Sequence, residues 1–162
     1  MRTIKYRGKN SLDEWVYGSL ISEEVENDNG KFMVTFIAPS IPCTSNGMDM
    51  WTAKMQRVKP ETIGQFTGLF DKNNREIYEG DIVKYTRYKV HSEYFKKDFI
   101  ENDYVVYWNE EKHAFYCTTK FESGGGASGY LNFHDERAEK EEIEVIGNIH
   151  DNPELLEGGK NE

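Results

Sequence analysis

The sequence predicts an all-β fold: a small N-terminal β subdomain followed by an SH3-like β-barrel or half-barrel, with few short helices. Aromatic residues make up 14% of the chain, and their enrichment favours strands over helices. The β-prone runs are separated by clusters of Asn, Asp and Gly that form tight turns. No apolar run reaches the ~20 residues that a membrane span requires, so no membrane association is expected.

The N-terminal subdomain, residues 1–59, is expected to form an antiparallel sheet. Asn27-Asp28-Asn29-Gly30 is a strong turn signal between two strand candidates, because Asn and Gly tolerate positive φ. Prolines 39 and 42 then interrupt the pattern, and the segment Lys59-Pro60-Glu61-Thr62 is the expected boundary. The strand candidates of this subdomain cover residues 3–6, 15–21, 32–37 and 50–58.

Residues 60–157 are expected to form the barrel-like subdomain, which opens with a hairpin. Asp71-Lys72-Asn73-Asn74 predicts the turn, centred on residues 72–74. Glu79-Gly80-Asp81 predicts a sharp bend, with a second strand beginning near Asp81. Residues 134–142 are compatible with a short helix or a charged loop, Asn152 and Pro153 begin a helical turn, and residues 158–162 are expected to be a disordered tail. Later strands are expected at residues 103–108, 114–119 and 144–149.

The stretch from Thr67 to Val83 resembles the signature of the YopX family of phage and prophage proteins, Thr-Gly-Leu-x-Asp-x-Asn-Gly-x-x-Ile-Tyr-Glu-Gly-Asp-Ile-Val. The opening, residues 1–20, and the closing segment, residues 144–156, are also similar to the family. One departure is that Asn74 stands where the pattern has Gly, and Asn is the next-best residue at positive φ. The resemblance implies a mostly β, phage-encoded protein that assembles into a ring, and it carries over no catalytic residues. Because the chain has no long apolar run and its start lacks the apolar core of a signal peptide, it is expected in the cytoplasm of the bacterial host.

Charge is unevenly distributed along the chain. The net charge is −9, of which residues 1–60 contribute +1 and residues 61–162 contribute −10. This acidity argues against sequence-independent wrapping of duplex DNA, which depends on phosphate neutralisation.

Within the acidic part, residues 84–97 form a local strip in which cations alternate with aromatic rings. Such a mixture can stack on unpaired bases and bind their phosphates. The same alternation is also typical of an ordinary half-buried strand, so both interpretations stay open. The candidate residues for single-stranded nucleic acid are Lys84, Arg87, Tyr88, Lys89, Tyr94, Lys96 and Lys97.

No catalytic, metal-binding or cofactor-binding residues are predicted. The four histidines lack the converging partners that a metal site needs, and Cys43 and Cys117 are expected to be buried, reduced thiols. Glu76, Glu79 and Asp81 could gather around a cation at the bend, although Asp81 could equally accept hydrogen bonds from turn amides.

The sequence therefore predicts a non-enzymatic assembly or binding module that forms a homo-oligomer through its β edges. A sheet of three or four strands cannot cover both edges and a full face by itself. The alternative is an accessory single-stranded nucleic-acid binder that uses the strip at residues 84–97. Residues expected to include both core and subunit contacts are Trp15, Tyr17, Leu20, Phe32, Val34 and Phe36.

Overall fold

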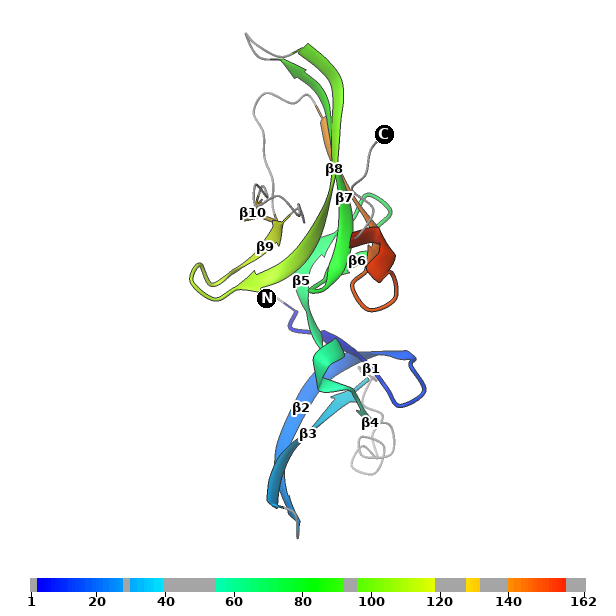
Figure 1. Ribbon diagram of the computed structural model, residues 1–162, viewed down its shortest axis with the longest axis vertical. Coiled ribbons are helices and arrows are strands. Elements are labelled where there is room, and N and C mark those ends of the chain that lie inside the picture. The colour runs from blue at the N-terminus through cyan, green and yellow to red at the C-terminus, as the bar shows by residue number, and fades with distance from the viewer. Residues whose placement is uncertain are drawn as a thin grey trace, which may run out of the picture. The chain divides into compact units, whose positions relative to one another are not determined.

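A computed structural model describes residues 3–27, 30–39, 55–91, 96–118, 128–131 and 140–156. The chain divides into two compact units, Met1–Gly68 and Leu69–Glu162, and each is built almost entirely of antiparallel strands (Figure 1). The predicted all-β class is therefore confirmed. The described strands form no closed barrel, so the SH3-like detail stays a prediction, and the predicted tail at residues 158–162 lies outside the described residues.

The first sheet has six strands in the order β4-β3-β2-β1-β5-β6, and all of them except β6 and the end of β5 belong to the first unit. Strand β5 continues past the division between the units, and its end leads into the hairpin that the signature predicts. The elements are β1 (Tyr6–Lys9), β2 (Trp15–Asn27), β3 (Gly30–Ala38), β4 (Gln56–Arg57), the 3-10 helix η1 (Pro60–Thr62) and β5 (Gly64–Phe70). The first strand begins later than the expected residues 3–6, because its ladder with β2 pairs Tyr6 with Gly18 and ends at Lys9 opposite Trp15.

A small core covers one face of this sheet. Val16, Ile37 and Val58 are buried together, and Tyr6, Leu20 and Ile63 pack against them. Because alternate residues of a strand point to opposite faces, Trp15 and Tyr17 lie on the face opposite Val16 and Leu20. Arg7 and Lys9 of β1 lie over the Trp15 ring, with the Arg7 guanidinium 4.7 Å from its centre, and Lys5, just before β1, lies over the Tyr17 ring.

The second unit is a five-stranded sheet with the order β10-β9-β8-β7-β11. Its core consists of residues from every one of these strands except β10, together with Ile77 and Leu131. The predicted hairpin and the strand start at Asp81 are confirmed. The elements are β6 (Glu76–Tyr78), β7 (Asp81–His91), β8 (Lys96–Asn109), β9 (Ala114–Thr118), β10 (Ser128–Tyr130), β11 (Lys140–Asn148) and the 3-10 helix η2 (Pro153–Leu156).

The last strand begins earlier than its sequence indicated. It was expected at residues 144–149, but β11 starts at Lys140, which lies opposite Tyr88 of β7. Residues 140–142 are therefore strand rather than helix or loop, because the long β7 offers them a backbone partner. Among the described residues, no helix is both long and apolar enough to cross a membrane.

Candidate functional site

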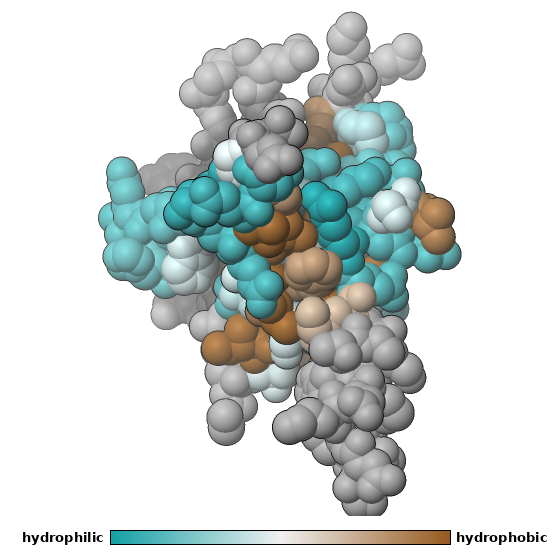
Figure 2. Space-filling model, turned by 90° about the horizontal axis from the view of Figure 1, so that it is seen from below, coloured by the Kyte–Doolittle hydropathy of each residue, from teal (hydrophilic) through white to brown (hydrophobic). Residues whose placement is uncertain are grey.

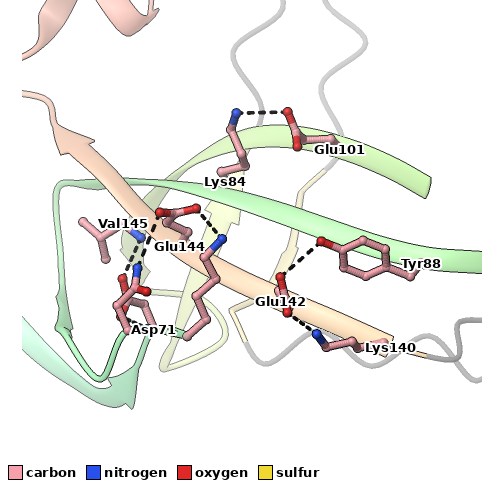
Figure 3. Close-up of polar contacts among 10 residues, drawn as sticks. Asp71, Lys84, Tyr88, Glu101, Lys140, Glu142, Glu144 and Val145 are labelled. Carbon is pink, nitrogen blue, oxygen red and sulfur yellow. Dashed lines mark hydrogen bonds and ion pairs between the residues drawn. The ribbon is translucent and has the colours of Figure 1, made fainter.

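The aspartate of the signature turn, Asp71, binds backbone amides. Its Oδ1 accepts the N–H groups of Asn73 and Arg75, both at 2.8 Å. Its Oδ2 accepts the N–H of Val145 in β11 at 3.1 Å (Figure 3). Burial raises the pKa of Asp71, but these amide hydrogen bonds outweigh burial and hold the pKa below its ordinary value. The carboxylate thus fixes the turn and attaches it to the last strand.

The carboxylates at the Glu79-Gly80-Asp81 bend are likewise hydrogen-bonded inside the fold. Asp81 is fully buried, and its Oδ2 accepts the N–H of Tyr78 at 2.7 Å. Glu79 accepts the N–H of Trp108 at 3.2 Å, and Glu76 accepts the hydroxyl of Tyr78 at 2.6 Å. No cluster of three or more His, Cys, Asp or Glu able to hold a metal ion occurs among the described residues. The amide-bonding interpretation of Asp81 is the one observed.

The described part of the basic-aromatic strip faces acidic side chains from neighbouring strands. Lys84 Nζ lies 3.0 Å from a carboxylate oxygen of Glu101 in β8, and this hydrogen bond raises the pKa of Lys84. Tyr88 donates its hydroxyl to Glu142 of β11 at 3.2 Å (Figure 3). The Lys140 ammonium lies 5.5 Å from the centre of the Tyr88 ring and also forms an ion pair with Glu142. Lys84 and Tyr88 thus each have an acidic partner within the fold.

The signature turn adds a further ion pair beside this strip. Lys72 Nζ lies 2.6 Å from Glu144, a hydrogen bond that raises the pKa of Lys72 and lowers the pKa of Glu144 (Figure 3). Both side chains are partly exposed, so this pair contributes little to stability. Residues 84–88, the near half of the strip, therefore have the acidic residues Glu101, Glu142 and Glu144 beside them.

The far half of the strip lies along the β7–β8 hairpin, which extends beyond the other strands of its unit (Figure 1). The backbone register places Val90 opposite Lys97 and His91 opposite Lys96. The hairpin thereby brings the backbones of Lys89, Lys96 and Lys97 to the same end. Tyr94 lies outside the described residues. Arg87 belongs to the near half, where its guanidinium is 5.8 Å from the centre of the Tyr85 ring.

The cysteine prediction is confirmed for Cys117, a free thiol that is completely buried. Burial raises its pKa to about 12, so the sulfur is protonated near neutral pH and unsuited to nucleophilic attack. Cys43 lies outside the described residues.

A second candidate surface lies on the β2–β3 hairpin and includes two residues that the sequence did not single out. Val25 is 37% exposed, Phe32 39% and Met33 55%. Val25 lies directly opposite Phe32, and Met33 lies on the other face of the hairpin, opposite Glu24. In the view of Figure 2, exposed hydrophobic residues are seen between hydrophilic ones. Apolar residues on both faces of one hairpin are the signal that identifies this surface.

Comparison with known proteins supports the assignment that the signature predicted. The family model described as YopX protein matches residues 5–157, nearly the whole chain. A solved structure titled "Crystal structure of protein EF1440 from Enterococcus faecalis" is similar at 21% identity and a TM-score of 0.40, covering 96% of this chain and 99% of that one. No curated protein matches the sequence. The protein belongs to the YopX family.

Proposed function

We propose that this protein is a non-enzymatic assembly or binding module that acts as a homo-oligomer. The observation that carries the proposal is the β2–β3 hairpin, which runs beyond its neighbouring strands with apolar side chains exposed on both faces. A two-stranded ribbon of this kind has little stability of its own. Contact with another copy would cover the exposed side chains and support the ribbon.

The extent of strand pairing defines this ribbon. Strand β1 pairs with β2 only at residues 15–18, and β4 pairs with β3 only at Phe36 and Ile37. The β2–β3 ladder continues from Ser19 opposite Ala38 to Asn27 opposite Gly30. The outer half of the ribbon, residues 23–27 of β2 and 30–34 of β3, therefore has no neighbouring strand among the described residues. Apolar side chains gathered on such a segment are typical of an interaction surface.

The use of the signature carboxylates supports a non-enzymatic role. Asp71, Glu79 and Asp81 each accept backbone N–H groups, so the most recognisable acidic residues of the chain maintain the hairpin and the bend. The signature is thus explained by folding requirements, without assigning its carboxylates to acid–base chemistry.

The proposal is tested by measuring molar mass with size-exclusion chromatography and light scattering at micromolar concentration. We expect a mass at least twice that of the 18.9 kDa chain. The double variant Phe32→Ser and Met33→Ser should have a lower mass, because it removes the exposed apolar side chains of the ribbon. Leu12→Ser is the matched control, since Leu12 is 75% exposed but lies in the β1–β2 loop. A monomeric wild-type protein would contradict the proposal.

A second candidate function is binding of single-stranded nucleic acid by the end of the β7–β8 hairpin. The observation that favours it is the register of that hairpin, which brings the backbones of Lys89, Lys96 and Lys97 together. This version of the hypothesis excludes Lys84 and Tyr88, whose side chains are engaged by Glu101 and Glu142.

A further inference from the structure

The β2–β3 ribbon has two edges, and their backbone orientation can be worked out from one hydrogen bond. Val58 donates its N–H to the carbonyl of Thr35 at 3.0 Å, so the peptide groups of Thr35 point away from β2. Because this orientation alternates along an antiparallel strand, the N–H and C=O groups of Met33 and Lys31 also point outward. On β2, the same alternation directs the backbone groups of Glu24 and Ser22 outward, away from β3.

The outer edge of β3 is not covered by other backbone of the described residues, whereas the outer edge of β11 is partly covered. In the second unit, β11 is the last strand of its sheet, and the signature turn covers part of its outer edge. Lys72 donates its N–H to the carbonyl of Ile143 at 2.8 Å, and Asp71 accepts the N–H of Val145. No comparable cover lies over residues 30–34 of β3 within the parts of the chain that the structure describes. An open edge of this kind is a template for pairing with another strand.

The two edges of the ribbon differ in charge. Strand β2 carries Glu23, Glu24 and Glu26 in its outer half, whereas residues 30–35 of β3 carry a single charge, Lys31. Charged side chains are a common protection of edge strands against pairing. If the β2 edges of two copies paired, three carboxylates from each copy would be brought together, and like charges across strands are destabilising. The β3 edge carries no such penalty.

We infer that the β3 edge pairs with the β3 edge of a second copy, antiparallel across a two-fold axis, with Phe32 directly opposite Phe32. This inference rests on the proposed homo-oligomer and names its contact. In this register, Lys31 and Met33 of one copy exchange backbone hydrogen bonds with Met33 and Lys31 of the other. The pairing therefore uses the outward groups and leaves the Thr35 carbonyl with Val58.

The same register also covers the exposed apolar side chains. Val25 lies beside Phe32 within each copy, so the two copies form a row of four apolar side chains across four adjacent strands. On the opposite face, the aliphatic stem of Lys31 lies beside Met33 of the second copy, and such stems cover apolar surface effectively. Because both copies contribute the same residues to this contact, it forms a closed two-fold interface.

Cysteine cross-linking tests the register. Residues opposite each other in a non-hydrogen-bonded antiparallel pair have Cα atoms about 4.5 Å apart, within the range that a disulfide can bridge. In a Cys43→Ser background, Phe32→Cys treated with oxidised glutathione should run mainly as a dimer on a non-reducing gel. Val25→Cys should stay mainly monomeric on the gel, because Val25 lies one strand further from the axis.

Proline substitution tests the edge. Met33→Pro removes an outward N–H, which is tolerated on an edge strand, and should reduce the native mass measured by light scattering by a factor of two or more. Glu24→Pro is the matched control on the β2 edge and should leave the mass unchanged. Circular dichroism of both variants confirms that the sheet is retained.

The outcomes separate this inference from the function on which it rests. A wild-type oligomer whose mass is unaffected by Met33→Pro, and whose Phe32→Cys variant does not cross-link, would overturn the β3 contact and leave the homo-oligomer standing. Equal loss of mass in Met33→Pro and Glu24→Pro would indicate pairing of β3 with β2 of the next copy and would overturn the two-fold arrangement. A monomeric wild type would overturn both proposals, and the partner of the β3 edge would then have to be a strand of a different protein.

Discussion

Asp71 accepts the backbone N–H of Val145 at 3.1 Å across 74 positions of sequence. The same carboxylate also holds the N–H groups of Asn73 and Arg75, so one side chain sets the turn and joins it to the final strand. This relationship explains why an aspartate stands at the centre of the signature. It also makes the turn a site where a conservative substitution should be costly.

Replacing Asp71 by Asn should destabilise the second unit by about 1–3 kcal/mol, the usual cost of leaving a buried donor without its acceptor. The amide oxygen can replace only one carboxylate oxygen, and the amide nitrogen would present a donor to another N–H. Denaturant unfolding followed by fluorescence measures the change. Glu61→Gln, at an exposed position of η1, is the control, and an equal loss in both variants would contradict the assigned role.

Acid should weaken the Asp71 contribution selectively. Its folded-state pKa lies below the ordinary value of 3.8, so the stabilisation is present above that value and is lost as pH falls through the lower, folded-state pKa. The difference in unfolding free energy between wild type and Asp71→Asn should therefore be larger at about pH 7 than at about pH 3. A difference that grows on acidification would show that the sign of the shift is wrong.

Asn74 should accept glycine more readily than valine. Its φ is 62°, in the left-handed region that costs a β-branched residue roughly 1–2 kcal/mol and costs glycine almost nothing. Asn74→Gly, which restores the signature, should keep or slightly raise the thermal midpoint, and Asn74→Val should lower it. Equal midpoints for the two variants would argue against a left-handed turn residue.

Gly18 should not tolerate a side chain. A Cβ at this position would lie 1.9 Å from the carbonyl oxygen of Ala38, so Gly18→Ala should force the β2 and β3 backbones apart. Overpacking of this kind typically costs about 1–3 kcal/mol, measurable as a lower thermal midpoint of the first unit. Ser19→Ala, at the neighbouring exposed position, is the control and should have little effect.

Titration with a single-stranded oligonucleotide at two salt concentrations tests the second candidate function. If the hairpin end binds, replacing Lys89, Lys96 and Lys97 by Gln should weaken binding. The slope of the logarithm of the binding constant against the logarithm of salt concentration should also become shallower by about 0.7 per lost phosphate contact. Lys84→Gln should change binding little, because Lys84 is paired with Glu101. The absence of a complex at low salt would remove this function and leave the assembly proposal unaffected.

The sequence by itself determined the β class, the turn at residues 72–74 and the strand start at Asp81. These features depend on local chemistry, since Asn and Asp adopt positive φ and accept nearby amides regardless of what packs around them. The family signature could be identified for the same reason, because its turn and bend are encoded within one short stretch.

Tertiary structure alone decided which charges meet and which edge is left open. Lys84 and Tyr88 belong to a basic strip in the sequence, but the β7–β8 and β7–β11 registers place Glu101 and Glu142 beside them. Likewise, the sequence named Phe32 as a candidate subunit contact, but only the short pairing of β1 and β4 shows that Phe32 and Met33 lie on an unflanked part of the β2–β3 ribbon. Strand partners and their registers are long-range choices made by the whole sheet, so no local pattern contains them.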